Sequence, residues 1–192
     1  MKPRLLIGLI VFALVATTAC NFSVNLGNRV TGSGNVVSEE RSVSGFNKVA
    51  LNGSGDLYIE QGETEALTVE TDDNLMQYIT TEVKDDTLEL GLKPNLNVFF
   101  SSKIVYLLKV KDLNSVRISG SGKVMSDSIQ TSDLSLSTAG SGKFEIGDLQ
   151  ATSLEASTSG SGEFIVAGKV NSVDVNIGGS RKFNSPHPGT HA

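Results

Sequence analysis

Two lysines stand where the lysine of a phosphate-binding loop would stand. Lys123 and Lys143 each follow a Gly-Ser-Gly tripeptide, and the lysine of that loop also follows a glycine. The loop further needs a Ser or Thr after the lysine and a helix whose N-terminus faces the phosphate. Val124 and Phe144 follow these lysines instead, and no helical period continues from them. The sequence therefore predicts no nucleotide site and no small-molecule cofactor.

Two pairs of adjacent carboxylates are the best candidates for a metal site. Asp72 and Asp73 form one pair, and Asp85 and Asp86 form the other. If the pairs met across neighbouring turns, they could bind a cation weakly, but calcium prefers six to eight oxygen ligands. Aspartates in such clusters commonly lie in solvent-exposed turns. We therefore expect turns here and no metal site.

The side chains that most often drive catalysis are scarce. Both histidines, His187 and His191, lie near the C-terminus, and Pro188 between them opposes the helix that would bring them to one metal. The single cysteine is Cys20. No two carboxylates have a spacing that marks them as the acid and base of glycoside hydrolysis. We expect no catalytic residues, with a β-helix enzyme acting on acidic polysaccharides as the alternative.

A Gly-Ser-Gly tripeptide recurs along the chain. Its spacing indicates how the strands that would carry a functional surface are arranged. Its copies begin at Gly32, Gly53, Gly120, Gly140 and Gly160, and a degenerate copy follows at Gly178-Gly179-Ser180. From Gly120 onward the step is close to 20 residues, and a fixed period of this size is typical of stacked repeats. Glycine adopts positive φ without strain and allows backbones to approach closely. Each copy is therefore expected at a tight corner of a coil.

Apolar and polar residues alternate on both sides of the tripeptides. Val116-x-Ile118 precedes one copy, and Lys143-Phe144 follows another. This period of two predicts strands with one buried face. A third apolar position recurs later in each repeat, at Ile129, Leu149 and Val170. The expected fold is all-β: a three-sided parallel β-helix, or solenoid, with coils of about 20 residues and Gly-Ser-Gly corners.

The stretch between Gly53 and Gly120 lacks the tripeptide but has strand-like runs, for example Ile104–Val110. Clusters at Asp72-Asp73-Asn74 and Lys84-Asp85-Asp86 are typical of turns. We expect coils with altered corners in this stretch. An antiparallel sandwich with hairpins at the two aspartate pairs is the alternative.

A stacked fold would present extended polar faces to solvent. The residues before the corners are candidates for a binding face that could contact a glycan or a protein of the envelope or host. These candidates are Ser135, Ser137, Thr138, Glu155, Ser157 and Thr158. The competing interpretation is that they are solvated positions without a partner.

The N-terminus has the pattern of a secretory signal. Lys2 and Arg4 precede an apolar run and then small residues, which predicts a signal peptide over residues 1–19. Cys20 stands where a bacterial lipoprotein is cleaved and acylated, although Thr17 replaces the usual aliphatic residue. We expect lipidation at Cys20 and a membrane-anchored tether over residues 20–29. Cleavage without lipidation is the alternative.

The charge of the remaining chain excludes some partners. Without residues 1–19 the chain has 14 basic and 21 acidic residues, and this acidity argues against nucleic acid or anionic lipid. Residues 184–192 show no periodicity, and we expect them to form a disordered tail.

Several segments together resemble one bacterial family. The runs Val43–Gly62, Leu67–Leu75 and Glu82–Leu88 are similar to the start of the "putative auto-transporter adhesin, head GIN domain" family. The resemblance covers residues 30–183 and implies a right-handed β-helix that is exported and secreted or lipid-anchored on the cell envelope. It carries no catalytic residue over to this chain. The degenerate copy at Gly178 departs from the pattern.

Together these observations predict a non-enzymatic cell-envelope lipoprotein that is an adhesin-like binding or structural module. An envelope stress sensor or scaffold that docks a membrane partner is a third alternative, beside the polysaccharide enzyme.

Overall fold

The computed structural model describes residues 29–179 and 182–184, which form strands and one 3-10 turn. The elements are β1 (Arg29–Thr31), β2 (Val36–Arg41), β3 (Lys48–Gly53), β4 (Asp56–Gln61), β5 (Ala66–Asp72), η1 (Met76–Tyr78), β6 (Ile79–Lys84), β7 (Thr87–Leu92), β8 (Asn97–Phe99), β9 (Val105–Val110), β10 (Ser115–Gly120), β11 (Lys123–Gly140), β12 (Lys143–Gly160), β13 (Glu163–Ile177) and β14 (Lys182–Asn184). The expected signal peptide, Cys20, the tether up to residue 28 and the tail from residue 185 lie outside the described residues. No helix among the described residues has the length and apolarity to span a membrane.

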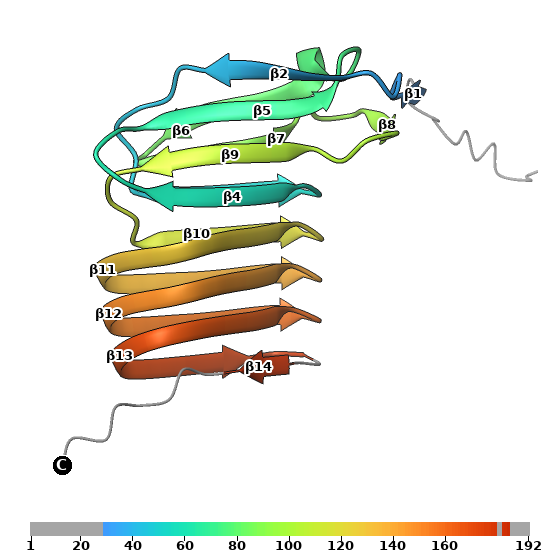
Figure 1. Ribbon diagram of the computed structural model, residues 1–192. Coiled ribbons are helices and arrows are strands. Elements are labelled where there is room, and N and C mark those ends of the chain that lie inside the picture. Colours follow the sequence, from blue (N-terminus) through green and yellow to red (C-terminus); the bar gives the residue numbers. More distant parts are fainter. Residues whose placement is uncertain (1–28, 180–181, 185–192) are drawn as a thin grey trace, which may run out of the picture.

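One mixed sheet of twelve strands curls around the core (Figure 1). Its order is β2-β5-β9-β4-β11-β10-β3-β7-β6, and β12, β13 and β14 extend it beyond β11. The first half of β11 pairs with β4, whereas its second half pairs with β10. Because one bent strand serves both sides, the sheet turns back on itself and becomes nearly closed, like a barrel. The strands β1 and β8 form a separate parallel pair.

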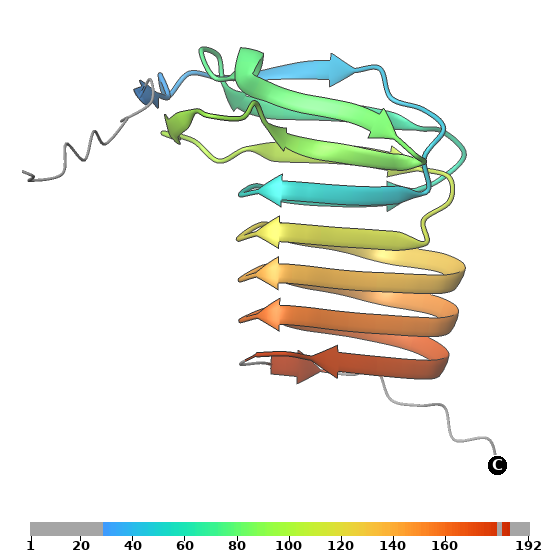
Figure 2. The same cartoon turned by 180° about the vertical axis from the view of Figure 1, so that it is seen from behind.

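The expected right-handed three-sided parallel β-helix is wrong. The pairs β2–β5, β5–β9 and β6–β7 are antiparallel, so the sheet is mixed. In addition, β11 and β12 each run unbroken from one corner to the next, bend once and contribute to two sides rather than three (Figure 2).

A turn explains part of this difference. Asp85 and Asp86 have φ values of 48° and 59°, and positive φ at both central residues is typical of the tight hairpin turn that reverses a strand. This turn joins β6 to β7 as an antiparallel hairpin. The coils with altered corners expected between Gly53 and Gly120 are therefore wrong, and one hairpin of the alternative, at Asp85-Asp86, is present. The other, at Asp72-Asp73, does not form, because β5 pairs with β2 and β9 instead.

From β10 to β13 the pairing is parallel, with strict register at the glycine corners. Gly53 pairs with Gly120, Gly120 with Gly140, and Gly140 with Gly160. Gly140 has a φ of 123°, and a Cβ atom added there would lie 2.5 Å from the carbonyl oxygen of Gly120. Only glycine fits this corner without strain or a backbone clash. The first tripeptide differs, since Gly32 donates its N–H to the carbonyl of Phe99 and lies outside the stack.

Large apolar side chains fill the space between the two sides of the sheet. Leu57, Val124, Phe144 and Phe164 follow successive corners, pair in register and are at most 1% exposed. The rings of Phe144 and Phe164 stack with centroids 5.1 Å apart and an interplanar angle of 9°. Burying each such side chain stabilises the fold by about 1.5–3 kcal/mol.

A buried carboxylate joins the N-terminal segment to the sheet. Asp72 is fully buried and accepts N–H bonds from Gly34 (3.1 Å), Ser101 (3.1 Å) and Ser102 (3.2 Å). Burial alone would raise the pKa of Asp72, but these donors and the Ser102 hydroxyl outweigh it and hold the pKa below its usual range. The donors occupy its oxygens, so Asp72 is a structural anchor and not a cation ligand.

We predict that Gly140→Ala lowers the free energy of unfolding by about 2–5 kcal/mol, through strain at positive φ and the clash with Gly120. Denaturant unfolding measures the loss. Gly62→Ala is the matched control, because a Cβ atom there meets no atom within 4 Å. Equal stability of the two variants would contradict the stacked-corner geometry.

We predict that Asp72→Asn lowers the free energy of unfolding by about 1–3 kcal/mol at pH 7, because a buried charge-assisted network is lost. The pKa of Asp72 is depressed in the folded state. Its stabilisation is therefore present above the unfolded pKa of about 3.9 and disappears as pH falls through the folded pKa. Denaturant unfolding between pH 7 and pH 3 should show that the difference in unfolding free energy between the wild type and Asp72→Asn becomes smaller as the pH falls. Asp127→Asn, at an exposed position, is the control, and a difference that stays constant with pH would refute this role of Asp72.

Candidate ligand-binding groove

One outer side of the sheet carries an apolar row that crosses several strands. We call this side, formed by β5, β9, β4 and the first halves of β11, β12 and β13, the groove face; it faces the viewer in Figure 1. The row follows the strand register from β5 to β13: Thr68, Leu107, Tyr58, Met125, Glu145 and Ile165. Neighbouring positions such as Leu57 and Ile59 point into the core, so Tyr58 must point outward.

A groove of about 940 Å³ follows this row. Tyr58 and Leu107 are its most exposed large apolar side chains, at 44% and 41%. Met125, Ile165 and Ala167 continue its lining, which is mostly apolar. An apolar concavity of this size on a regular sheet is typical of a binding site.

Gln61 fixes one end of the groove. Its side-chain nitrogen donates to the carbonyls of Lys111 and Gln130, each at 3.0 Å, and its oxygen accepts the N–H of Gln130 at 2.7 Å. This side chain therefore ties β4 to the chain after β9 and to the middle of β11. The strands that carry Tyr58 and Met125 are thus held in one position.

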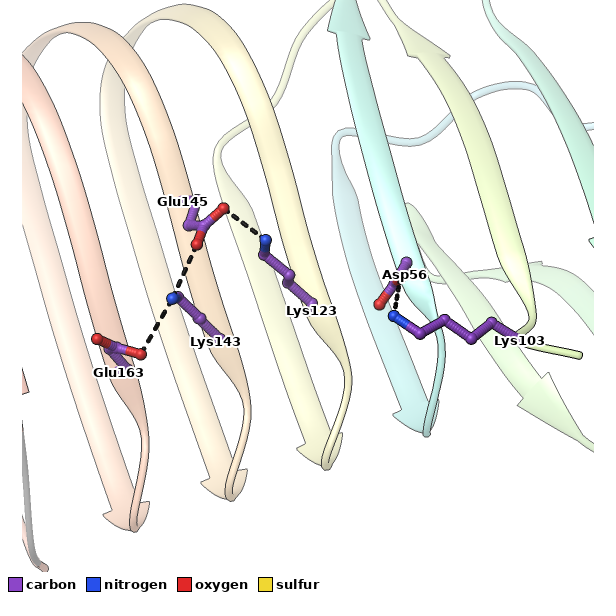
Figure 3. A network of polar contacts seen from close by, with 6 residues as sticks. All are labelled: Asp56, Lys103, Lys123, Lys143, Glu145 and Glu163. Carbon is purple, nitrogen blue, oxygen red and sulfur yellow. Dashed lines mark hydrogen bonds and ion pairs between the residues drawn. The ribbon is translucent and has the colours of Figure 1, made fainter. Parts of the chain in front are cut away.

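Charged side chains line two borders of the groove. At one border Lys109 pairs with Glu60 at 3.6 Å. At the other, Glu145 lies between Lys123 (2.6 Å) and Lys143 (2.8 Å). Figure 3 shows this network, which Lys143 continues to Glu163 at 3.2 Å. A separate pair joins Lys103 to Asp56 at 2.9 Å in the same view.

The network keeps the carboxylate of Glu145 ionised. The contacts with Lys123 and Lys143 hold the pKa of Glu145 below its usual range. Contacts with Glu145 and Glu163 raise the pKa of Lys143. Asp127, which also lines the groove, is exposed and has no ion-pair partner among the described residues. The groove therefore combines an apolar floor with one free negative charge.

The acidic groups with shifted pKa values do not resemble a catalytic pair. The pKa values of Asp72, Asp73, Glu82 and Glu145 are all lowered, whereas a general acid needs a raised pKa. The buried hydroxyl of Ser126 donates toward the carbonyls of Ile59 and Ser128, and not toward a base. Residues 29–179 contain no group of three or more His, Cys, Asp or Glu that could hold a metal ion.

The binding face expected from the sequence lies on the other side of the molecule. We call this side, formed by β7, β3, β10 and the second halves of β11, β12 and β13, the polar face; it faces the viewer in Figure 2. Ser135 pairs in register with Glu155, and Ser137 with Ser157. All four point outward, and the hydroxyl of Ser135 approaches Glu155 at 3.4 Å.

Two residues of the predicted binding face are buried instead of exposed. Thr138 and Thr158 are 3% and 5% exposed and point into the core. Their hydroxyl oxygens have no hydrogen-bond partner within the described structure. They follow Ser137 and Ser157 by one residue, and one step along a strand reverses the direction of the side chain. They therefore cannot contact a ligand on the polar face.

The residues of the groove were not identified from the sequence, although a signal was present. Asp56-Leu57-Tyr58-Ile59 and Tyr106-Leu107-Leu108 place an apolar residue where the alternation requires an outward one. An outward apolar residue in a half-buried strand indicates a contact surface. Tyr58 and Leu107 meet this criterion, but only the register shows that β4 and β9 are neighbours.

Comparison with known proteins agrees with this architecture. A family model described as "Putative auto-transporter adhesin, head GIN domain" matches residues 45–186, which confirms the resemblance noted in the sequence. No curated protein matches the chain.

Several solved structures have a similar fold. A "putative adhesin" from Parabacteroides distasonis ATCC 8503 has a TM-score of 0.65 at 23% identity, with 82% of this chain and 76% of that chain covered. A "putative adhesin" from Parabacteroides merdae ATCC 43184 has a TM-score of 0.63 at 21% identity, covering 81% and 83%. A "putative lipid binding protein" from P. distasonis ATCC 8503 has a TM-score of 0.61 at 19% identity, covering 81% and 98%.

Proposed function

Because the chain belongs to the head GIN domain family of putative auto-transporter adhesins, we propose that it is a non-enzymatic, adhesin-like binding module of the bacterial cell envelope. The groove on the groove face is its ligand site. The observation that carries this proposal is the row in which Leu107, Tyr58 and Met125 lie side by side on three paired strands, where no strand or loop of the described residues covers them.

The physical argument rests on exposed apolar area. Burying the exposed part of Tyr58 and Leu107 under a ligand would release ordered water and favour binding. Because the strands are held by register, Gln61 and the core, little conformational entropy is lost when a ligand binds. The site is therefore prepared for contact without rearrangement.

The charges of the groove favour a particular ligand class. Glu60 and Glu145 are neutralised by lysines, whereas Asp127 has no ion-pair partner among the described residues. An uncharged or cationic amphiphile suits this surface better than an anionic one. The similar proteins titled as adhesins and as a lipid-binding protein are compatible with amphiphilic ligands such as glycolipids. The pKa values of Asp72 and Glu145 are lowered, which makes both residues poor general acids. This favours a binding role over acid–base chemistry.

The polar face provides a second surface for the same role. Ser135, Ser137, Glu155 and Ser157 point outward in two rows and could donate and accept hydrogen bonds with a glycan or protein. This surface lacks the apolar area of the groove, so we assign it an auxiliary part in binding.

Attachment to the envelope completes the proposal. The sequence before Cys20 has the composition of an export signal, and Cys20 follows Ala19. We propose that Cys20 is acylated and that residues 21–28 connect the anchor to the folded module. Two or three acyl chains would suffice for stable anchoring.

We predict that octyl glucoside, an uncharged amphiphile with a sugar head group, binds in the groove. Titration below its micelle concentration, followed by NMR, should shift the signals of Tyr58, Leu107 and Met125. The double variant Tyr58→Ser/Leu107→Ser should bind about tenfold more weakly. The two side chains are each less than half exposed, so together they lose about as much apolar contact with the ligand as one fully exposed large side chain would.

The matched control is Ser137→Ala/Ser157→Ala on the polar face, which should bind as the wild type does. If the control variant loses binding while the groove variant keeps it, the ligand site is on the polar face and the assignment of the groove is wrong.

We predict that Cys20→Ala abolishes incorporation of radiolabelled palmitate and releases the protein from the membrane fraction. The folded module should be unchanged, because residue 20 precedes its first strand. Palmitate labelling followed by fractionation measures both effects. Label retained in the Cys20→Ala variant would disprove the anchor.

A further inference from the structure

The last turn of the sheet is only half covered. β13 pairs along its length with β12, whereas β14 pairs only with Glu163–Ile165 at the start of β13. Within the described part of the chain, no strand pairs with the open side of residues 172–177. We call residues 172–177 the acceptor edge.

Core positions become exposed at this edge. Val173 is 41% exposed, whereas its register equivalents Leu154 and Leu134 are each 1% exposed. Val175 and Ile177 are half-buried, although Ala156 and Thr158 above them are buried. One additional strand would cover all three side chains of the acceptor edge.

The backbone of the acceptor edge is also ready for pairing. The N–H of Gly178 donates to the carbonyl of Thr158 at 2.8 Å, so the backbone N–H of Gly178 points toward β12. Hydrogen-bonding direction alternates along a strand. The N–H and C=O groups of Val173, Val175 and Ile177 therefore point to the open side, where a further strand would bind them.

Two other open edges of the sheet, β2 and β6, are protected by charge. β2 ends in Glu39, Glu40 and Arg41, and β6 carries Glu82 and Lys84. Charged side chains on an edge oppose the addition of another strand. The acceptor edge has the sequence Ser-Val-Asp-Val-Asn-Ile, with Asp174 as its one charge.

The charge at Asp174 selects the partner. Asp174 pairs in register with Glu155, so two carboxylates are adjacent on the outer face. A third strand with Lys or Arg opposite Asp174 would relieve this repulsion. Residues 185–192 contain two prolines and no large apolar residue, so their composition does not match the acceptor edge.

We propose that the acceptor edge binds an extended segment of a partner protein as an added β-strand. The segment has apolar residues at alternate positions, which cover Val173, Val175 and Ile177, and a basic residue opposite Asp174. It would lie level with β14 and complete the turn that β14 begins. This site is separate from the groove and does not depend on the proposed function.

The test uses the full chain and a synthetic peptide with the sequence Ser-Val-Lys-Val-Asn-Ile, which is the acceptor edge with Lys in place of Asp. Calorimetric titration should show saturable binding, and NMR should show shifts at the amides of Val173, Val175 and Ile177. A scrambled peptide of the same composition, without the alternation, should bind at least about tenfold more weakly.

Two variants locate the site. Val175→Pro removes an N–H that points to the open side, and edge positions of this kind tolerate proline; it should fold and lose binding by about tenfold or more. Asp174→Lys should weaken binding of the Lys peptide by about two- to fivefold and regain it with a peptide that has Asp at that position. This charge exchange keeps the test valid if the proline variant does not fold.

Three outcomes would overturn the proposal. The first is that the peptide does not bind at the acceptor edge. This would be seen either as no binding up to about 1 mM or as equal binding to the wild type and to both variants. The second is a wild-type dimer that Val175→Pro converts to a monomer, which would make a second copy the occupant. The third is slow amide exchange at Val175 in the free chain that is lost on deletion of residues 185–192, which would make the chain's own C-terminal segment the occupant.

Discussion

The close approach of backbones at the glycine corners is the constraint on which this structure depends. Gly53, Gly120, Gly140 and Gly160 lie in register one above another. At neighbouring corners the N–H of Ser141 donates to the carbonyl of Gly120, and that of Ser161 to the carbonyl of Gly140. A side chain at Gly120, Gly140 or Gly160 would displace the backbone of the neighbouring corner. Since each turn of the chain must begin at the same place as the one before it, inward and outward positions repeat from strand to strand.

This repetition explains how the outer surfaces arise. Inward positions stack as a continuous core, for example Phe144 on Phe164. Outward positions stack as rows, and the content of each row depends on the sequence of each strand. On the groove face, Tyr58 and Met125 share a row with Leu107. One outward apolar residue on each of three strands therefore forms a single exposed surface. Glu145 stands in this row on β12 and binds Lys123 and Lys143 of the neighbouring row, and these ion pairs define one border of the groove. The sheet thereby presents a continuous exposed row of apolar side chains on paired strands.

The sequence allowed the repeating corners and the strands around them to be predicted, because glycine spacing and alternation are local signals. It did not allow the path from Gly53 to Gly120 to be predicted. The turn at Asp85 and Asp86 is local, and a hairpin there matches the alternative interpretation of this stretch. The antiparallel pairs β2–β5 and β5–β9 and the anchoring of Gly34 and Ser101 by Asp72 connect residues far apart in sequence. The binding face predicted from the sequence lies on the polar face and not on the groove for a similar reason. Serines before the corners were visible in the sequence, whereas the meeting of Tyr58 with Leu107 requires the strand order.

The stacked glycine corners thus order the sheet that carries both proposed contact sites, an apolar groove on its surface and an open strand at its end. Amide hydrogen exchange at the corners measures whether the backbones are stacked there in solution. Ser141 and Ser161 are exposed residues in tight turns, yet their N–H groups donate to carbonyls of the preceding corner at 2.9 and 2.8 Å. If the corners are stacked, both amides exchange at least about a thousandfold more slowly than in an unstructured peptide. Exchange near the unstructured rate at these two amides, while the strands beside them remain protected, would contradict this stacking.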